Sequence, residues 1–195
     1  AGRQYTTSVD GQKNLKIAVY QGERDLVQHN RKLSEFILRN IPPMPAGLPK
    51  IDIQFYLDAD GILQVKASEL RSGMAQEITI RAAYSLSEEE MALMLIDSMQ
   101  NAQSDMQTRA LLEARNEANN IVLATEKFLI QNASILSSYE KNKTKKLNAA
   151  LKNASAGDNK DAILAAIENL NHYTEPLAHR ALDVNIAEAM KGKQI

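Results

Sequence analysis

The sequence contains neither cysteine nor tryptophan, and only 5% of its 195 residues are aromatic. Without cysteine it has no disulfide framework and no thiolate chemistry, which fits a reducing compartment. No apolar run reaches membrane-spanning length, and the first residues do not resemble a signal peptide. The net charge of −1 argues against nucleic acid, because phosphate recognition needs a basic face. We therefore expect no membrane and no nucleic acid among its partners.

Glycine and proline are scarce and unevenly distributed. Six of the eight glycines and four of the five prolines precede Met74. In this part the alternation of apolar residues predicts strands near residues 3–8, 14–20, 32–38, 51–57, 62–67 and 76–81. After Leu86 the apolar period changes to 3.6, which is typical of helices. The sequence thus predicts an α+β fold, with a β-sandwich over residues 1–85 and a helical bundle over 86–195.

Two stretches carry the clearest strand pattern. Leu15, Ile17 and Val19 alternate with smaller or polar residues, so one face of that strand is apolar. A second alternating run over 51–57 is followed by Asp58-Ala59-Asp60-Gly61 and by a third run over 62–67. Two alternating runs across a tight Asp/Gly turn predict a β-hairpin.

The helical part carries its own start signals. Ser87-Glu88-Glu89-Glu90 predicts a capping box, and Ser104 offers a second start. Further caps are expected at Ser137-Ser138 and at Asp158 or Asn159, and Pro176 is expected to kink or restart the last helix. A methionine stripe along the first helix is expected to pack in the core; it comprises Met91, Met94, Met99 and Met106.

Three motifs occur in the same order as in a known protein family. They are Gln21-Gly22-Glu23-Arg24, the loop Ile-Pro-Pro-x-Pro-x-Gly-x-Pro over 41–49, and Asp-Ala-Asp-Gly-Ile-Leu-x-Val over 58–65. With the helical tail, the chain resembles the substrate-binding domain of seventy-kilodalton heat-shock chaperones of the DnaK type. Residues 21–28 and 111–118 are most similar to the HscA branch, which serves iron–sulfur cluster assembly.

The resemblance implies a peptide-binding β-sandwich followed by a helical lid. In the family two further strands and a loop precede the strand at residues 3–8, so the sandwich is expected to be incomplete at its N-terminus. It also implies that this chain is not an enzyme and holds no cofactor. ATP, magnesium and the ATPase would belong to a nucleotide-binding domain that this sequence does not include. A cytoplasmic, bacterial location is expected.

The same resemblance assigns site residues. The peptide-binding set, comprising pocket, polar-contact and arch positions, is Tyr5, Thr6, Ser8, Gln12, Leu15, Lys16, Ile17 and Ile51. The lid hinge is expected to join Arg24, Asp105 and Arg115. Taken from alternation alone, Leu15, Ile17 and Ile51 would be ordinary core residues.

The implied partners are extended apolar or proline-containing peptides, an iron–sulfur scaffold protein and, through the full-length protein, a J-domain co-chaperone. Two alternatives stay open: a general DnaK-type chaperone for unfolded proteins, and a helical scaffold that binds no peptide.

A metal site is not expected. The Asp58 loop resembles a calcium loop, but Leu63 stands where such a loop needs glycine. The basic run Lys141–Lys146 is interpreted as a solvated helix face.

Overall fold

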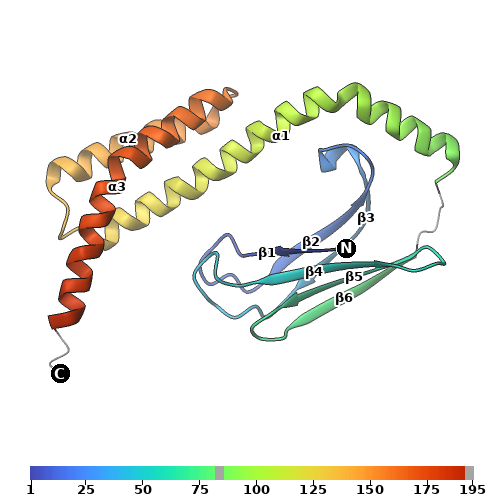
Figure 1. Cartoon of the computed structure of the whole chain (residues 1–195), viewed down its shortest axis with the longest axis horizontal. Coiled ribbons are helices and arrows are strands. Elements are labelled where there is room, and N and C mark those ends of the chain that lie inside the picture. The colour runs from blue at the N-terminus through green and yellow to red at the C-terminus, as the bar shows by residue number, and fades with distance from the viewer. Residues whose placement is uncertain (82–85, 192–195) are drawn as a thin grey trace. The chain divides into compact units, whose positions relative to one another are not determined.

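The computed structural model describes residues 1–81 and 86–191, and the chain divides into two compact units. The first unit comprises Ala1–Asp105 and the second Met106–Ile195. The boundary predicted after residue 85 follows a segment, 82–85, that lies outside the described residues. The contacts divide the chain farther on, inside the helix α1 (Glu88–Gln131). The α+β class is as predicted, with antiparallel sheets followed by three helices (Figure 1).

The first unit contains two antiparallel sheets. A four-stranded sheet has the order β1 (Gly2–Tyr5), β4 (Ile51–Leu57), β5 (Ile62–Glu69) and β6 (Ala75–Arg81). A two-stranded sheet pairs β2 (Leu15–Gln21) with β3 (Arg31–Leu38). Five predicted strands are confirmed with ends shifted by at most two residues.

The first strand is shorter than predicted because its continuation bonds to a loop. β1 ends at Tyr5 instead of extending to Ser8. The carbonyl of Thr7 accepts from the amide of Gly47 at 3.0 Å, and the Ser8 amide donates to the side chain of Gln12 at 3.2 Å. These backbone groups are therefore used outside the sheet ladder.

The predicted hairpin joins β4 and β5. The Asp58 carboxylate accepts from the amides of Asp60 at 3.0 Å and Ile62 at 2.8 Å, and Gly61 has a φ of 76°. Glycine suits this left-handed position because it has no Cβ. The hairpin sets a register in which Phe55 lies opposite Val65.

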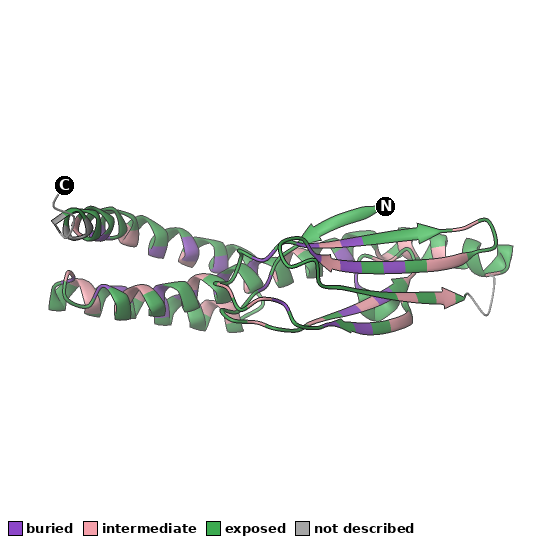
Figure 2. Cartoon of the chain, turned by 90° about the horizontal axis from the view of Figure 1, so that it is seen from below, coloured by how far each residue is buried: buried purple, intermediate pink, exposed green. Residues whose placement is uncertain are grey.

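Alternation along the strands places one face of each in a common core. In Figure 2 buried segments alternate with exposed ones along the strands. The buried cluster comprises Ile17, Val19, Phe36, Leu38, Ile41, Ile51, Ile53, Val65 and Ala67. Leu15, Leu33, Leu63, Ile78 and Ile80 pack against it while partly exposed. Burial of this apolar surface, at about 25 cal/mol per Å², is the main stabilising term of the unit.

Helix α1 begins as the sequence predicts and then runs past Ser104 without a break. The Ser87 amide donates to the Glu90 carboxylate at 2.8 Å, and the Glu90 amide donates to Ser87 Oγ at 3.2 Å. This reciprocal pair satisfies two amides that have no partner inside the helix. The second start at Ser104 is not found, because no glycine or proline interrupts the 44 residues of α1.

The methionine stripe is not core packing, so that expectation is wrong. Met91, Met99 and Met106 are exposed, and Met94 is half-buried. Helical spacing shows which side chains share a face of α1, but it does not show whether anything covers that face.

The second unit packs the distal part of α1 with α2 (Ser138–Ala156) and α3 (Lys160–Lys191). Its buried cluster is Ala114, Ala118, Val122, Leu151, Ile163, Ile167 and Leu170. Asn159 caps α3, because its side-chain oxygen accepts from the Ala162 amide at 3.0 Å. Pro176 lies inside α3 without ending it, and the ribbon of α3 changes direction along its length (Figure 1). No helix among the described residues is both long and apolar enough to cross a bilayer.

The N-terminus of α2 is fixed by a charged capping box. Glu140 accepts from the Ser137 amide at 2.8 Å and from Arg180 of α3 at 2.9 Å. The Arg180 guanidinium, followed by the Ser137 amide and hydroxyl, lowers the pKa of Glu140 from its ordinary 4.5 to about 2. Glu140 therefore links the start of α2 to α3 as long as it is ionised.

We expect the bundle to lose stability in acid through Glu140. Because the folded pKa is depressed, the contribution is complete above pH 4.5 and is lost as pH falls toward 2. Thermal melts at pH 6 and pH 3, followed on bundle resonances, will show a larger drop for the wild type than for Glu140→Gln. Equal drops would show that Glu140 does not contribute this dependence.

Candidate functional site

Two loops of the first unit are bound together at the end of β1 and the start of β2. The first runs over residues 6–14, and the second is the proline-rich segment 41–49. The contacts between them are Gly11 N to Met44 O at 2.9 Å, Ala46 N to Asp10 Oδ1 at 2.8 Å, Gly47 N to Thr7 O at 3.0 Å, and Ile41 N to Lys13 O at 2.9 Å. Prolines restrict the second loop further, since each fixes its own φ. The pair forms one stiff rim beside the apolar core.

The predicted pocket residues next to this rim differ in how far they are exposed to solvent. Ile51 has no exposed surface and Ile17 is 7% exposed, and both belong to the core cluster. Leu15 is partly exposed at the edge of that cluster. Tyr5 lies directly opposite Ile51 in the β1–β4 register and keeps 46% of its surface exposed. Of the predicted pocket residues, Tyr5 and Leu15 therefore keep accessible apolar surface, while Ile17 and Ile51 are part of the buried core.

The predicted polar contacts are mostly engaged within the unit. Gln12 accepts from the Ser8 amide at 3.2 Å and donates to the Asn14 carbonyl at 2.9 Å. Lys16 forms an ion pair with Glu35 of β3 at 3.4 Å. Thr6 and Ser8 are exposed on the first loop. In this structure Gln12 fixes the shape of the loop, because both the amide and the hydroxyl of Ser8 donate to its side-chain oxygen.

Thr7 is a buried loop residue that the sequence analysis did not include among the site residues. It is 2% exposed, and its Oγ1 has no hydrogen-bond partner in the described structure. A buried hydroxyl without a partner costs free energy, about 1–3 kcal/mol. The strand predicted near residues 3–8 would place Thr6 and Thr7 on opposite faces, but two adjacent threonines do not show which of them is buried.

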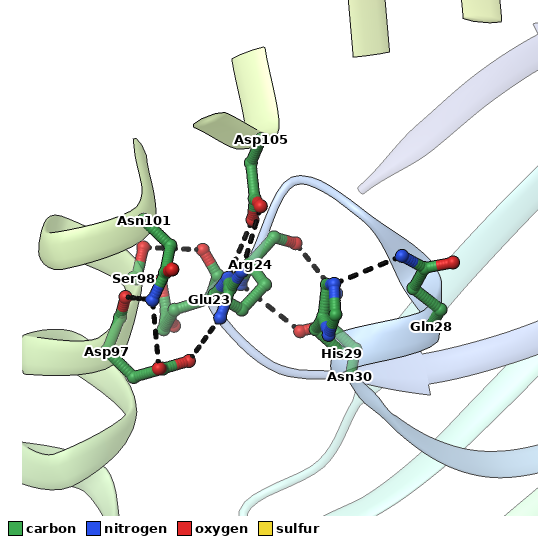
Figure 3. A network of polar contacts seen from close by, with 9 residues as sticks. All are labelled: Glu23, Arg24, Gln28, His29, Asn30, Asp97, Ser98, Asn101 and Asp105. Atoms are coloured by element: carbon green, nitrogen blue, oxygen red, sulfur yellow. Dashed lines mark hydrogen bonds and ion pairs between the residues drawn. The ribbon is translucent and has the colours of Figure 1, made fainter. Parts of the chain in front are cut away.

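A second group of polar residues joins the β2–β3 loop to the first turns of α1. Arg24 donates through Nε and Nη2 to Asp105 at 2.6 and 2.8 Å, and through Nη1 to Asp97 at 2.6 Å (Figure 3). Ser98 Oγ donates to the Glu23 carbonyl at 2.8 Å. The Arg24 side chain is only 12% exposed, and its two-pronged bond to Asp105 has the geometry of strong charge-assisted pairs.

The charges of this network stabilise one another. The hydrogen bond from Arg24 holds the pKa of Asp105 below its ordinary range, although burial alone would raise it. The bonds to Asp105 and then Asp97 raise the pKa of Arg24. Both partners therefore remain charged at neutral pH.

The loop that carries Arg24 is shaped by Gly22 and Asn30. Asn30 accepts from the Arg24 amide at 3.1 Å and donates to the Arg24 carbonyl at 2.7 Å. Gly22 has a φ of 155°, and a Cβ there would collide with Oδ1 of Asn30. Only glycine fits, so the Gly22-Glu23-Arg24 motif has a steric reason for its first residue.

Arg115, the third residue of the predicted hinge, has its hydrogen-bond partners elsewhere in the structure. Arg115 donates to the Gly157 carbonyl at 2.9 Å and to Asp158 at 2.6 Å, so its partners lie in the loop before α3. It lies ten residues beyond Asp105, about 15 Å along an α-helix, and belongs to the helical bundle. Asp97, in contrast, was missed. The available signal was its spacing of eight residues from Asp105, which places two carboxylates near one side of a helix.

The described part of the chain offers no metal centre. Within residues 1–81 and 86–191, no group of three or more histidine, cysteine, aspartate or glutamate side chains could hold an ion. Asp58 Oδ1, which resembled a calcium ligand, instead accepts the amides of its own turn.

The structure thus contains a β-sandwich and a helical bundle. It also contains an arginine–aspartate network at the start of a long helix. A family model described as "Hsp70 protein" matches residues 1–183, and the chain belongs to this family. Its relatives include the "Chaperone protein HscA homolog" of Janthinobacterium sp. (strain Marseille) and that of Herminiimonas arsenicoxydans, each 42% identical over 99% of this chain. The "Chaperone protein HscA" of Yersinia enterocolitica is 40% identical over the same share. The chain spans 31% of the length of each of these relatives.

Proposed function

We propose that the first unit holds an extended peptide segment of a client protein at the rim formed by residues 6–14 and 41–49. The observation that carries this proposal is a stiff, hydrogen-bonded loop pair beside the partly exposed Leu15 and Tyr5. An extended peptide presents alternating side chains and free backbone groups, so an apolar recess with polar edges can bind it. We expect the exposed residues Thr6 and Ser8 to contact its backbone.

We propose further that the client is an iron–sulfur scaffold protein, bound through a proline-containing extended motif. The support is the resemblance of residues 21–28 and 111–118 to the HscA branch, together with the names of the relatives. ATP, magnesium and a J-domain co-chaperone would then act through the part of the relatives that this chain does not cover. A general DnaK-type chaperone would instead accept many apolar peptides.

Peptide arrays distinguish these functions. The protein to use is residues 1–195 together with the upstream strands that the family resemblance implies. Selective binding of proline-containing motifs supports the scaffold client, and broad binding of apolar peptides supports the general chaperone. No binding to any peptide would contradict the proposed peptide site and leave the bundle as a scaffold.

Leu15→Ser will weaken peptide binding about tenfold. The reason is the loss of about 1.5 kcal/mol of apolar contact at the recess, and 1.4 kcal/mol corresponds to a factor of ten. Fluorescence anisotropy with a labelled apolar peptide measures the affinity. Leu57→Ser is the matched control, since Leu57 is 66% exposed at the end of β4. If both variants bound like the wild type, Leu15 would not be part of the site.

A further inference from the structure

Helix α2 carries a concentration of positive charge in a chain that is almost neutral. It holds five lysines and one glutamate, whereas the whole chain has a net charge of −1. The single glutamate, Glu140, is bound by Arg180 and by the Ser137 cap. Lys143 lies over the ring of Tyr173 of α3 at 4.5 Å. Lys145, Lys146 and Lys152 are exposed, and α2 has no further carboxylate to neutralise them.

Two of these lysines border a hollow between α1 and α2. It has a volume of about 500 Å³ and is lined by Glu126, Leu129 and Ile130 of α1 and by Lys145, Asn148, Ala149 and Lys152 of α2. Among the described residues, neither Lys145 nor Lys152 has an ion-pair partner. Glu126 on the opposite wall leaves the hollow with an excess of one positive charge.

Asn148 lines the hollow and has one buried atom without a hydrogen-bond partner. Asn148 is 7% exposed, and its amide nitrogen donates to the Val122 carbonyl at 3.5 Å. Its Oδ1 is buried without a partner. Most buried side-chain oxygens in folded proteins accept a hydrogen bond, so this one is an exception inside the bundle. At the edge of the hollow, Ile130 near the end of α1 exposes 78% of its surface.

We propose that this hollow is a docking surface for an acidic amphipathic helix of a partner protein. Lys145 and Lys152 are seven residues apart, two helical turns or about 10 Å along α2. Two carboxylates at positions i and i+7 of a partner helix match that spacing. An apolar stripe between them covers Ile130 and Leu129. A helix laid between α1 and α2 adds a fourth helix to the bundle and uses the helix-in-groove mode of recognition.

A synthetic helical peptide of about 18 residues tests this surface against the whole 195-residue chain. It carries a leucine stripe and glutamates at i and i+7; a second peptide has lysines at those two positions. The variant Lys145→Glu/Lys152→Glu removes the charge pair. Lys141→Glu/Lys146→Glu is the matched control, because it makes the same charge change on α2 outside the hollow. Fluorescence anisotropy measures binding, and helical circular dichroism shows that both variants are folded.

The acidic peptide will bind the wild type and the control variant alike, and the groove variant at least about tenfold more weakly. The lysine peptide will recover binding to the groove variant, which simple loss of folding cannot produce. The proposal is overturned if the acidic peptide does not bind, or if both double variants lose equal affinity. It is also overturned if phosphatidylserine vesicles or single-stranded DNA bind the wild type and displace the peptide from this face.

Discussion

Ile17→Asp will unfold the β-unit while the helical bundle stays folded. Ile17 is 7% exposed and lies in the core shared by both sheets. Burying a carboxylate there, without a partner in the surrounding cluster, costs several kcal/mol, about 3–5 by the usual effect of such substitutions. The bundle has its own core in residues 106–195, so its resonances will persist. Urea titration followed by two-dimensional NMR separates the two units.

The matched control is Ile17→Val, which removes one methylene and costs about 0.5–1.5 kcal/mol. It will lower the urea midpoint of the β-unit resonances without eliminating them. If the strand resonances of Ile17→Asp remained dispersed as in the wild type, Ile17 would not be a core residue. If both units unfolded together in either variant, the division near Asp105 would not reflect independent stability.

Asp105→Ala will loosen the start of α1 from the β2–β3 loop. The substitution removes two of the three hydrogen bonds that Arg24 makes with carboxylates and leaves its guanidinium mostly shielded from solvent. Removing one partner of a shielded pair is costly because the remaining charge is left uncompensated. Hydrogen exchange in residues 22–30 and 88–105 will accelerate by about tenfold or more, since local opening sets that rate.

Glu113→Ala is the control for this effect. It breaks the Arg109–Glu113 pair on the same helix, whose two side chains are 56% and 65% exposed. Exposed pairs of this kind contribute about 0–1 kcal/mol, so exchange will change little. Arg24→Lys will have an intermediate effect, because an ammonium cannot reproduce the two-pronged contact. Unchanged exchange in Asp105→Ala would mean that the network does not hold this segment of α1.

Local signals in the sequence predicted local structure well. The Asp58–Gly61 turn and the Ser87–Glu90 box are both found, because each depends on residues only three or four apart. Most strand ends also follow from alternation. The continuous α1 shows the limit of the approach, since Ser104 is a competent cap that the helix passes through.

The candidate site was less predictable because it depends on distant contacts. Alternation put Leu15 and Ile17 on one face, but only packing shows that Leu15 lies at the edge and Ile17 inside. The family motif identified Arg24 and Asp105, while Asp97 and the bundle partners of Arg115 required the helices to be placed in space. A residue pattern indicates which face a side chain occupies, not which neighbour it meets.

Photo-crosslinking is the most direct test of the peptide site. An apolar peptide with a single photoreactive side chain at its centre is bound to residues 1–195 joined to the upstream strands, irradiated, and mapped by mass spectrometry. The peptide site proposed here predicts crosslinks at Tyr5, Thr6 and Leu15, which are the partly or fully exposed members of the proposed site. Crosslinks confined to residues 106–195, or to the exposed Tyr56 and Leu57 of β4, would contradict it.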